Sequence, residues 1–275
     1  MDLRCKYSPS LRVAITGSTG FVGRRLIDIF AAGDFQSAAI EDVENGSVIV
    51  HLAAVVSPTR DALIENIAID SLVLEQANLK GGGIVYASTN NVYPLKLDCE
   101  VSDVLTGGDY YASSKILGEK LLVDMARVPV FIARVADVFG VGQRHGNLFK
   151  ALAQSIKGGD PLVQYGNGSK RRTYIHVDEL CSCLKFSALK MMSKPRETVL
   201  ANLGYQDSAT VSEIIALISK AKNIPVEFVR SEVDPPNEDV RTMRPTLLDG
   251  YQPTWPSFRE ALLSFVSELD SESTE

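Results

Sequence analysis

The sequence is poor in cysteine, histidine and tryptophan, and it contains no long run of hydrophobic or of basic residues. Its four cysteines lack the spacing of zinc ligands, so they predict free thiols in a cytoplasmic protein without a metal site. There is no signal-peptide pattern and no apolar stretch of about 20 residues, so no association with a membrane is expected. With 28 basic against 34 acidic residues, and the basic ones scattered, nucleic acid is not expected as a partner either.

What the chain does contain is enough apolar sequence to bury a core. Hydrophobic residues make up 45% of the 275, which suffices for one large domain or for a domain with a smaller lobe. Short apolar runs alternate with helical patterns, which is typical of a parallel sheet with helices on both faces. Up to residue 157, strands are expected at 11–16, 48–52, 84–87 and 128–134, and helices at 20–32, 61–79, 110–125 and 148–156.

Past residue 157 the pattern changes to short strands between helices. The predicted fold is therefore α/β, with a Rossmann-type doubly wound parallel sheet over residues 1–157 and a small C-terminal α/β substrate lobe over 158–275. Some elements of the second part are expected to return to the first domain. Here strands are expected at 162–165, 173–177, 198–202 and 226–229, and helices at 178–190, 211–221 and 257–269.

The predicted sheet is shortened after its first βα unit. The stretch from Gly33 to Ser47 is too short for the units that this fold normally places there, so at least one is missing or reduced. Two registers are open. In one, residues 35–40 form the second strand and Glu41 holds a ribose. In the other, residues 37–45 form a short helix, and helix-forming residues there favour this register.

The central motif is Thr16-Gly17-Ser18-Thr19-Gly20-Phe21-Val22-Gly23, at the junction of the first strand and the first helix. Gly17 permits a tight turn, Gly20 lets the backbone approach a phosphate, and Gly23 lets the helix pack closely on the sheet. The helix then directs unpaired N–H groups and the positive end of its dipole at an anion. The motif therefore predicts a binding site for the pyrophosphate of a dinucleotide.

A second pattern predicts acid–base chemistry. Tyr111 and Lys115 are four residues apart in a predicted helix, so they share one face. The ammonium is expected to lower the pKa of the phenol and so make Tyr111 a general acid and base for an alcohol or a carbonyl. Ser88 and Thr89 directly follow a buried strand, at the sheet edge where parallel α/β folds bind ligands. A hydroxyl there can hydrogen-bond the same substrate oxygen.

Together these motifs resemble the extended short-chain dehydrogenase/reductase superfamily, in its NAD-dependent epimerase/dehydratase branch, which acts on nucleotide-activated sugars. The resemblance covers almost the whole chain. It is carried by the glycine turn, by His51-Leu52-Ala53-Ala54, by the segment from Ala87 to Tyr93 and by the Tyr111/Lys115 pair. Residues 134–140 and 172–179 are similar to two further family segments.

The resemblance implies which residues form the site. Thr89, Tyr111 and Lys115 would be catalytic, and hydride would pass between a sugar carbon and a nicotinamide cofactor, NAD being favoured over NADP. The choice between Arg241 and Arg244 for a second phosphate contact stays open. Cofactor contacts are implied for Gly17, Gly20, Phe21, Val22, Gly23, Asp34, Phe35, Leu52, Ala53, Ala54, Ala87, Ser88, Tyr111 and Lys115, and substrate contacts for Asn66, Asn90, Asn91, Asp137, Arg172, Arg241 and Arg244.

Departures from the family pattern narrow the activity. Related 4,6-dehydratases have Asp and Glu after the catalytic threonine, whereas Asn90 and Asn91 here cannot transfer protons in that way. Related fucose synthases have a cysteine at the position of Asn91, so 3,5-epimerisation also loses support. A carboxylate at Asp137, where the family usually has asparagine, would repel a phosphate. His51 and His176 are interpreted as buried structural residues.

The predicted reaction is therefore hydride transfer at C4 of a nucleotide-activated sugar. Net 4-epimerisation is the first hypothesis, and a reductase of nucleotide 4-ketosugars that consumes NAD(P)H is the second. The third is a non-catalytic NAD(P)-binding sensor or scaffold, against which the joint presence of Thr89, Tyr111 and Lys115 argues. A homodimer that pairs through the predicted helices 61–79 and 110–125 is also expected.

Overall fold

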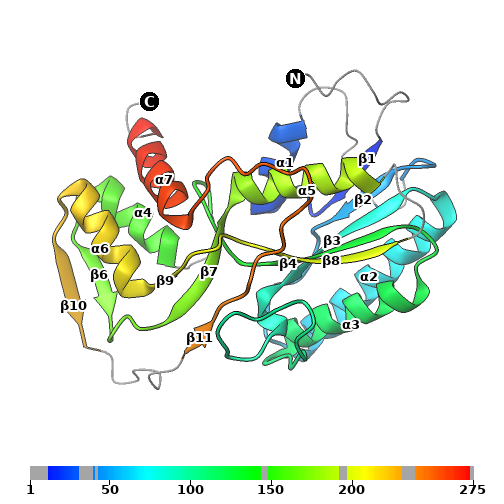
Figure 1. The fold of residues 1–275 in the computed structure, drawn as a ribbon, viewed down its shortest axis with the longest axis horizontal. Helices are drawn as coiled ribbons and strands as arrows, with labels where there is room; N and C mark the ends of the chain where they lie inside the picture. Colours follow the sequence, from blue (N-terminus) through cyan, green and yellow to red (C-terminus); the bar gives the residue numbers. More distant parts are fainter. Residues whose placement is uncertain are drawn as a thin grey trace. The chain divides into compact units, whose positions relative to one another are not determined.

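The computed structural model describes residues 12–30, 40, 43–143, 148–191, 197–230 and 239–272. Its elements are drawn in Figure 1. The chain divides into two compact units whose segments interleave along the sequence. The first unit extends to Val92 and also includes Leu105–Arg134 and Cys181–Ala201, and the second holds Tyr93–Val104, Val135–Leu180 and the residues from Asn202 onward. The domain boundary predicted after residue 157 stays a prediction.

The first unit is built on a five-stranded sheet with the strand order β1-β2-β3-β4-β8. The β1–β2 and β2–β3 pairs are parallel, and Val13 is the register partner of Val48. Nearly every residue of the first four strands is buried, as expected for short valine- and isoleucine-rich runs that are covered on both faces, whereas only the second half of β8 is buried. The strands are β1 (Val13–Thr16), β2 (Val48–His51), β3 (Gly83–Thr89), β4 (Val130–Val135) and β8 (Thr198–Leu203).

Helices cover both faces of this sheet, as Figure 1 shows. On one face α2 (Arg60–Lys80) and α3 (Tyr110–Met125) lie side by side. Their apolar residues form a core with the strands, in which Val73 and Leu122 contact a cluster that includes Ile84. The other face carries α1 (Phe21–Phe30) and α5 (Val177–Met191), joined where the Lys185 ammonium donates to the Ile29 carbonyl at 2.9 Å. The predicted Rossmann-type α/β fold is confirmed.

Side-chain caps set where α2 and α3 begin. The Thr59 hydroxyl accepts from the Ala62 N–H at 3.3 Å, and the Asp109 carboxylate accepts from the Ala112 N–H at 2.7 Å. Each satisfies an N–H group that has no partner within its helix. The Asp109 cap holds Tyr111 in the first turn of α3.

The shortened stretch lies largely outside the described residues, so both registers predicted for residues 33–47 stay predictions. Within the described part of the chain, β1 is at one end of the strand order, next to β2. Ile40 and Val43 pack on the same core as α2 and α3.

The second unit has its own core. Aromatic side chains dominate it: Phe139 stacks on Phe149 at 4.7 Å, and Tyr174 stacks on Phe258 at 4.8 Å between ring centroids. Thr210 and Glu213 form a capping box at the start of α6. The elements are β5 (Asp137–Phe139), α4 (Leu148–Gly158), β6 (Leu162–Tyr165), β7 (Arg171–His176), β9 (Ser208–Thr210), α6 (Val211–Lys222), β10 (Val226–Val229), β11 (Val240–Arg241) and α7 (Phe258–Glu272).

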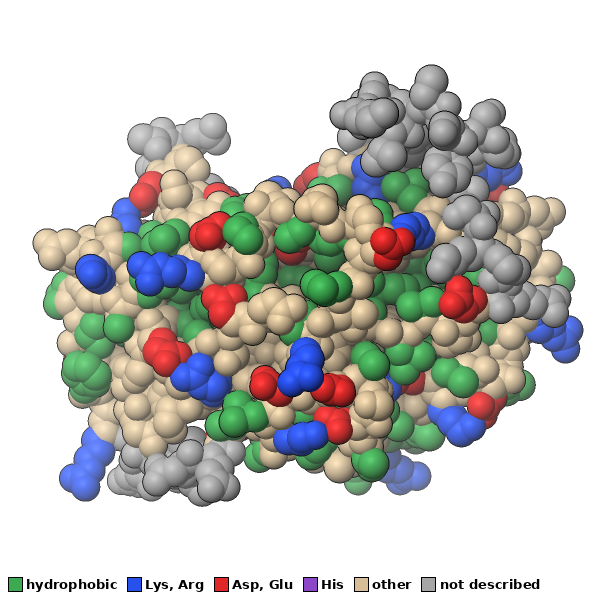
Figure 2. Space-filling model, viewed as in Figure 1, with side chains coloured by type: hydrophobic (Ala, Val, Ile, Leu, Met, Phe, Trp, Pro, Cys, Tyr) green, Lys and Arg blue, Asp and Glu red, His purple; other side chains and the backbone are tan. Residues whose placement is uncertain are grey.

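Charged side chains of both signs are interspersed over the face in Figure 2, where several Lys or Arg groups lie directly beside Asp or Glu groups. None of the helices within the described ranges is both long and apolar enough to span a bilayer.

Candidate active site

The glycine turn is formed by backbone contacts that leave no room for side chains. Gly17 has φ 72°, and a Cβ there would lie 2.7 Å from the Ala53 nitrogen. A Cβ on Gly23 would lie 2.2 Å from the Gly17 oxygen. Gly23 is therefore needed for the close packing of α1 on the turn, and not on the sheet as predicted. The turn is closed by the Gly20 N–H, which donates to the Gly17 carbonyl at 3.0 Å.

This turn fits the diphosphate of a dinucleotide. Gly20 is exposed, and the only atom that a Cβ there would approach within 4 Å, among the described residues, is the Gly17 oxygen at 3.2 Å. Phe21 and Val22 follow as the first residues of α1, whose N–H groups have no partner within the helix. The predicted contacts of Asp34 and Phe35 with the adenine lie outside the described residues.

The predicted catalytic residues lie on two neighbouring elements of the first unit. Thr89 is the last residue of β3, and its hydroxyl oxygen accepts from the Asn91 N–H at 3.2 Å. Asn90 and Asn91 continue into a short 3-10 helix, η3 (Asn90–Val92). Helix α3, which carries Tyr111 and Lys115, packs on both β3 and η3.

The electrostatics of the Tyr111/Lys115 pair differ from expectation. Burial raises the pKa of Tyr111 to about 12, with Asp109 and Asp70 adding to the shift. The pKa of this phenol is therefore raised, and the prediction that it is lowered is wrong. The Lys115 side chain is 2% exposed, and its ammonium lies over the Tyr86 ring, 4.5 Å from the centroid. Burial lowers the pKa of Lys115, and the charges of Asp70 and Glu119 act in the opposite direction.

A buried ion pair lies one turn further along α3. The Glu119 carboxylate accepts from Arg134 of β4, with an Nη2 contact at 2.7 Å and two Nε contacts at 3.1 Å. It also accepts from the hydroxyl of Ser88, the residue before Thr89, at 2.5 Å. Both charged side chains are almost fully buried. This pair ties the end of β3 to α3 and β4.

A second buried polar cluster connects the glycine turn to α2. The Asp70 carboxylate is 2.9 Å from His51 Nε2 and accepts from the Tyr86 hydroxyl at 2.8 Å. Because a carboxylate only accepts, His51 donates from Nε2, and the Thr16 hydroxyl, 2.6 Å from Nδ1, donates to the neutral ring. Burial lowers the pKa of His51, which agrees with a neutral ring. His51 is thus the buried residue that was predicted.

Sequence reasoning missed Asp70, Tyr86 and the Glu119–Arg134 pair. A signal for Asp70 was present, because an acidic residue on the buried side of an otherwise apolar helix stripe requires a partner. The partners themselves come from β2 and β3, and only the folded chain brings them together.

Asn66 makes hydrogen bonds within the protein that were not predicted. Its side-chain amide donates to the Val55 carbonyl at 3.1 Å and to the Ser114 hydroxyl at 3.0 Å, and its oxygen accepts from the Val55 N–H at 2.7 Å. Both donors of the buried amide are used within the protein, so Asn66 has a structural role, and its predicted substrate contact stays a prediction. Ser114 in turn donates to the Tyr111 carbonyl at 2.7 Å, so Asn66 supports the first turn of α3.

The predicted substrate residues of the second unit are largely engaged with protein groups. Arg172 is buried, and its guanidinium donates to the Asp239 carboxylate and, at 2.7 Å, to the Asp239 carbonyl. Arg241 is the register partner of Arg172 on the neighbouring parallel strand. Asp137 is half-buried in β5, and its charge contributes to raising the pKa of Tyr174.

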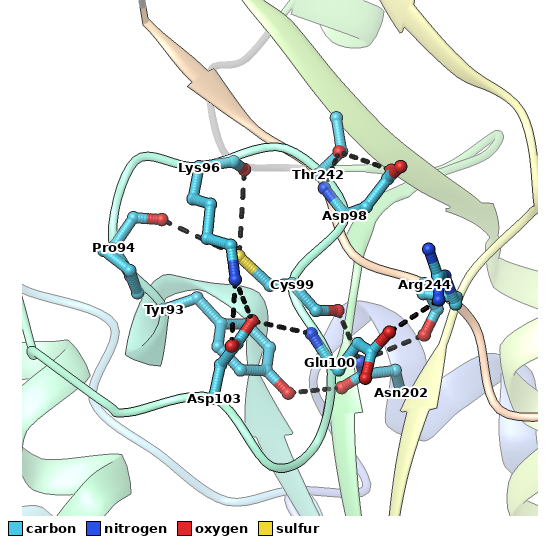
Figure 3. A network of polar contacts seen from close by, with 10 residues as sticks. All are labelled: Tyr93, Pro94, Lys96, Asp98, Cys99, Glu100, Asp103, Asn202, Thr242 and Arg244. Atoms are coloured by element: carbon cyan, nitrogen blue, oxygen red, sulfur yellow. Dashed lines mark hydrogen bonds and ion pairs between the residues drawn. The ribbon is translucent and has the colours of Figure 1, made fainter.

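Arg244 belongs to a polar network around residues 93–103 (Figure 3). Its exposed guanidinium pairs with Glu100 at 2.6 Å, while the Lys96 ammonium pairs with Asp103 at 2.8 Å. Asn202 donates to the carbonyl groups of Cys99 and Arg244, both at 3.1 Å. This network attaches the segment to the chain at residues 242–244.

These features define a class of protein: a Rossmann-type enzyme with a dinucleotide-binding turn and with a tyrosine and a lysine on the helix beside β3. Residues 33–201 match the model of the NAD dependent epimerase/dehydratase family, and the chain belongs to this family. The match begins after the glycine turn. An enzyme of the extended short-chain dehydrogenase/reductase type, with NAD as the cofactor of its family, is therefore confirmed.

Individual relatives are distant. The chain is 21% identical to the GDP-6-deoxy-D-talose 4-dehydrogenase of Aggregatibacter actinomycetemcomitans, over 85% of this chain and 87% of that protein. A structure of MoeE5 in complex with UDP-glucose and NAD has a TM-score of 0.78 at 20% identity, covering 96% of this chain and 100% of the other. The UDP-N-acetylglucosamine 4-epimerase from Methanobrevibacter ruminantium M1, in complex with UDP-N-acetylmuramic acid, gives 0.76 at 17% identity, covering 96% and 100%. At these identities the two structures show the fold.

Proposed function

We propose that this protein catalyses NAD-dependent hydride transfer at C4 of a nucleotide-activated sugar, with 4-epimerisation as the net reaction. The observation that carries the proposal is the presence of Tyr111 and Lys115 on α3, which packs on β3 and its Thr89 end, and the two residues that follow Thr89 are amides. Asn90 and Asn91 cannot perform the proton transfers at C5 and C6 that dehydration requires. The names of two relatives, a 4-dehydrogenase and a 4-epimerase, support position 4.

In this mechanism the protein's own groups handle the proton of the sugar hydroxyl. Tyr111 accepts that proton when it is in the phenolate form and then returns it, and Thr89 hydrogen-bonds the same sugar oxygen. The Lys115 ammonium supplies a buried positive charge on the same helix face. When bound, NAD supplies the hydride acceptor and then the donor. Glycines 17, 20 and 23, with the N-terminus of α1, would hold its diphosphate.

A reductase of nucleotide 4-ketosugars is the second candidate, and one observation favours it. Because burial raises the pKa of Tyr111 to about 12, the residue is a protonated phenol at neutral pH. A phenol is the form that donates a proton to a carbonyl oxygen as it is reduced. One relative is named a 4-dehydrogenase, and this name describes oxidation or reduction at the same position.

The substrate's diphosphate is assigned to arginines of the second unit. Arg172 and Arg241 are register partners on adjacent parallel strands, so their side chains leave the sheet on the same side. Two neighbouring guanidinium groups suit two phosphates. Arg244, exposed and paired with Glu100, is assigned no phosphate contact.

The purified protein tests these alternatives directly. Its bound nucleotide is released by denaturation and identified by chromatography, and the protein is incubated with UDP-, GDP- and dTDP-hexoses. Retained NAD and interconversion of two 4-epimers support the first proposal, whereas an empty site and stoichiometric consumption of NAD(P)H on a 4-ketosugar support the second. Binding of NAD without turnover of any sugar leaves the sensor hypothesis.

The variant Tyr111→Phe separates catalysis from binding. We expect turnover to fall about 100-fold or more, because the general acid and base is removed, while NAD still binds. Tyr110→Phe is the matched control, since Tyr110 is the preceding residue and is 50% exposed. Equal activity of both variants would contradict the role of Tyr111.

A homodimer through α2 and α3 is part of the proposal. Exposed apolar side chains recur at spacings of seven or eight residues, which places them on one side of each helix: Ile64, Leu72 and Leu79 on α2, and Tyr110 and Leu117 on α3. The family resemblance favours a second copy as the partner. Light scattering should give twice the chain mass for the wild type and a monomer for Leu72→Glu, with Leu247→Glu, exposed in the second unit, as control.

The predicted cytoplasmic location is also retained as a proposal. Its support is that Cys99, Cys181 and Cys183 are free thiols. Cell fractionation followed by immunodetection tests it.

A further inference from the structure

Four charged side chains are buried together where α2 and α3 pack on the sheet. Two are cationic, Lys115 and Arg134, and two are anionic, Glu119 and Asp70, and each is less than 5% exposed. Glu119 is engaged by Arg134 through three contacts of 2.7–3.1 Å. Asp70 has no ion pair with an arginine or a lysine within the described part of the chain. The charges of Asp70 and Glu119 both favour the Lys115 ammonium, and Asp70 is the one of the two that is not already paired with Arg134.

Geometry places the Asp70 carboxylate between the glycine turn and Lys115. One oxygen receives the His51 N–H at 2.9 Å, and His51 in turn accepts from Thr16, the residue before Gly17. The other oxygen receives the Tyr86 hydroxyl at 2.8 Å, and the face of the Tyr86 ring carries the Lys115 ammonium at 4.5 Å. The Asp70 carboxylate therefore accepts hydrogen bonds both from His51, on the side of the glycine turn, and from Tyr86, on the side of Lys115.

The packing around this carboxylate is tight. A Cβ on Gly118 would lie 2.2 Å from an Asp70 carboxylate oxygen and 2.3 Å from the Tyr86 hydroxyl oxygen. Gly118 therefore lets α3 approach α2 closely at this point. A side chain at position 118 would displace the Asp70 carboxylate or the Tyr86 hydroxyl.

We propose that Asp70 is a positioning residue for the reaction. Its carboxylate neutralises the buried Lys115 ammonium, and its hydrogen bonds to Tyr86 and His51 fix the position of Lys115 relative to Thr16 at the end of β1. The proposal rests on the proposed function for the statement that Lys115 serves catalysis. The electrostatic part concerns the protein alone and can be tested without substrate.

Every charged or titratable group that faces Lys115 and Tyr111 enters the expected pH behaviour. These are Asp70 from α2, His51 from β2, Tyr86 from β3, Arg134 from β4, and Asp109 and Glu119 beside or within α3. Asp70 raises the pKa of both Lys115 and Tyr111, so the loss of its charge lowers both. Both limbs of a bell-shaped pH–rate profile then move to lower pH.

The first test is a double-mutant cycle on the apo protein. Asp70→Asn keeps the shape and removes the charge, Lys115→Met removes the cation, and melting temperatures are compared with those of the double variant. We expect the double variant to lose less stability than the two single variants lose together, because it buries no unpaired charge. Asp61→Asn, exposed on the same helix, should change little. Additive effects would overturn the proposal, and if Asp70→Asn does not fold, recovery of folding by Lys115→Met supports it.

The second test uses the holoenzyme and its pH–rate profile. Asp70→Asn should lower kcat by up to about 100-fold, through displacement of Lys115, and should move both limbs to lower pH. Tyr86→Phe removes one hydrogen bond but keeps the Asp70 charge, so it should lower kcat without moving the limbs. If Asp70→Asn lowers the rate at every pH but leaves both limbs of the pH–rate profile where they are, Asp70 has a merely structural role. If the wild type turns over no sugar while the apo cycle shows coupling, the proposed function fails and the electrostatic role of Asp70 stands.

Discussion

Replacement of Glu119 by glutamine is expected to be among the most destabilising conservative changes in this chain. The substitution keeps the volume but removes the negative charge that meets the Arg134 guanidinium at 2.7–3.1 Å. Arginine stays protonated at any accessible pH, so Arg134 cannot become neutral to relieve its burial. The Ser88 hydroxyl also loses a charged acceptor.

The magnitude follows from the burial of both partners. Removing one partner of a buried ion pair costs about 3–5 kcal/mol, and in a chain of this size each kcal/mol lowers the melting temperature by roughly 2–4 °C. Glu119→Gln should therefore melt roughly 10 °C below the wild type. Circular dichroism during heating and urea titration measure both quantities.

The control lies on the same helix. Asp124→Asn breaks a pair with Lys120 that is exposed on both sides, and such pairs contribute about 0–1 kcal/mol. It should melt within about 2 °C of the wild type. A Glu119→Gln protein that loses less than about 1 kcal/mol would refute the view that this ion pair fastens β3 and β4 to α3.

Three further predictions concern the cofactor turn, the buried histidine and the substrate arginines. Gly23→Ala places a Cβ 2.2 Å from the Gly17 oxygen and should weaken NAD binding at least tenfold by calorimetry, whereas Gly108→Ala, which has open space, should bind normally. Because the pKa of His51 lies below its ordinary 6.5, the unfolded chain binds more protons, so the urea midpoint should fall as the pH drops from about 7 to 5. His51→Gln should make the urea midpoint depend less on pH. If the dependence is unchanged in this variant, groups other than His51 cause it. Arg241→Ala should raise KM about tenfold and Arg244→Ala less than twofold, and the reverse order would contradict the assignment.

Most of the fold could be predicted because its elements have strong patterns. The strand at 48–52 and the helices at 61–79 and 110–125 agree with β2, α2 and α3 to within one or two residues. The strands β5, β9 and β11 were not predicted, since two or three residues are too few for a period to be recognised. Their pairing with β7 depends on contacts far along the chain.

The places of Tyr111 and Lys115 in the fold were predictable, but their electrostatics were not. Spacing alone places Tyr111 and Lys115 on one face of α3, yet burial, with Asp109 and Asp70, raises the pKa of Tyr111. That ammonium lies over the Tyr86 ring, a contact between helix and strand that no local pattern encodes. Asn66 was assigned to substrate by family likeness, and its use of both amide donors within the protein became visible only in the folded chain.

The central claim, hydride transfer between C4 of a nucleotide sugar and NAD, is tested most directly by rapid mixing of the NAD-loaded protein with a nucleotide hexose deuterated at C4. Absorbance of the reduced nicotinamide at about 340 nm should rise more slowly than with the unlabelled sugar, and the cofactor should carry the deuterium by mass spectrometry. Deuterium that remains entirely on the sugar, with no change in absorbance for any sugar that the protein binds, would contradict the account.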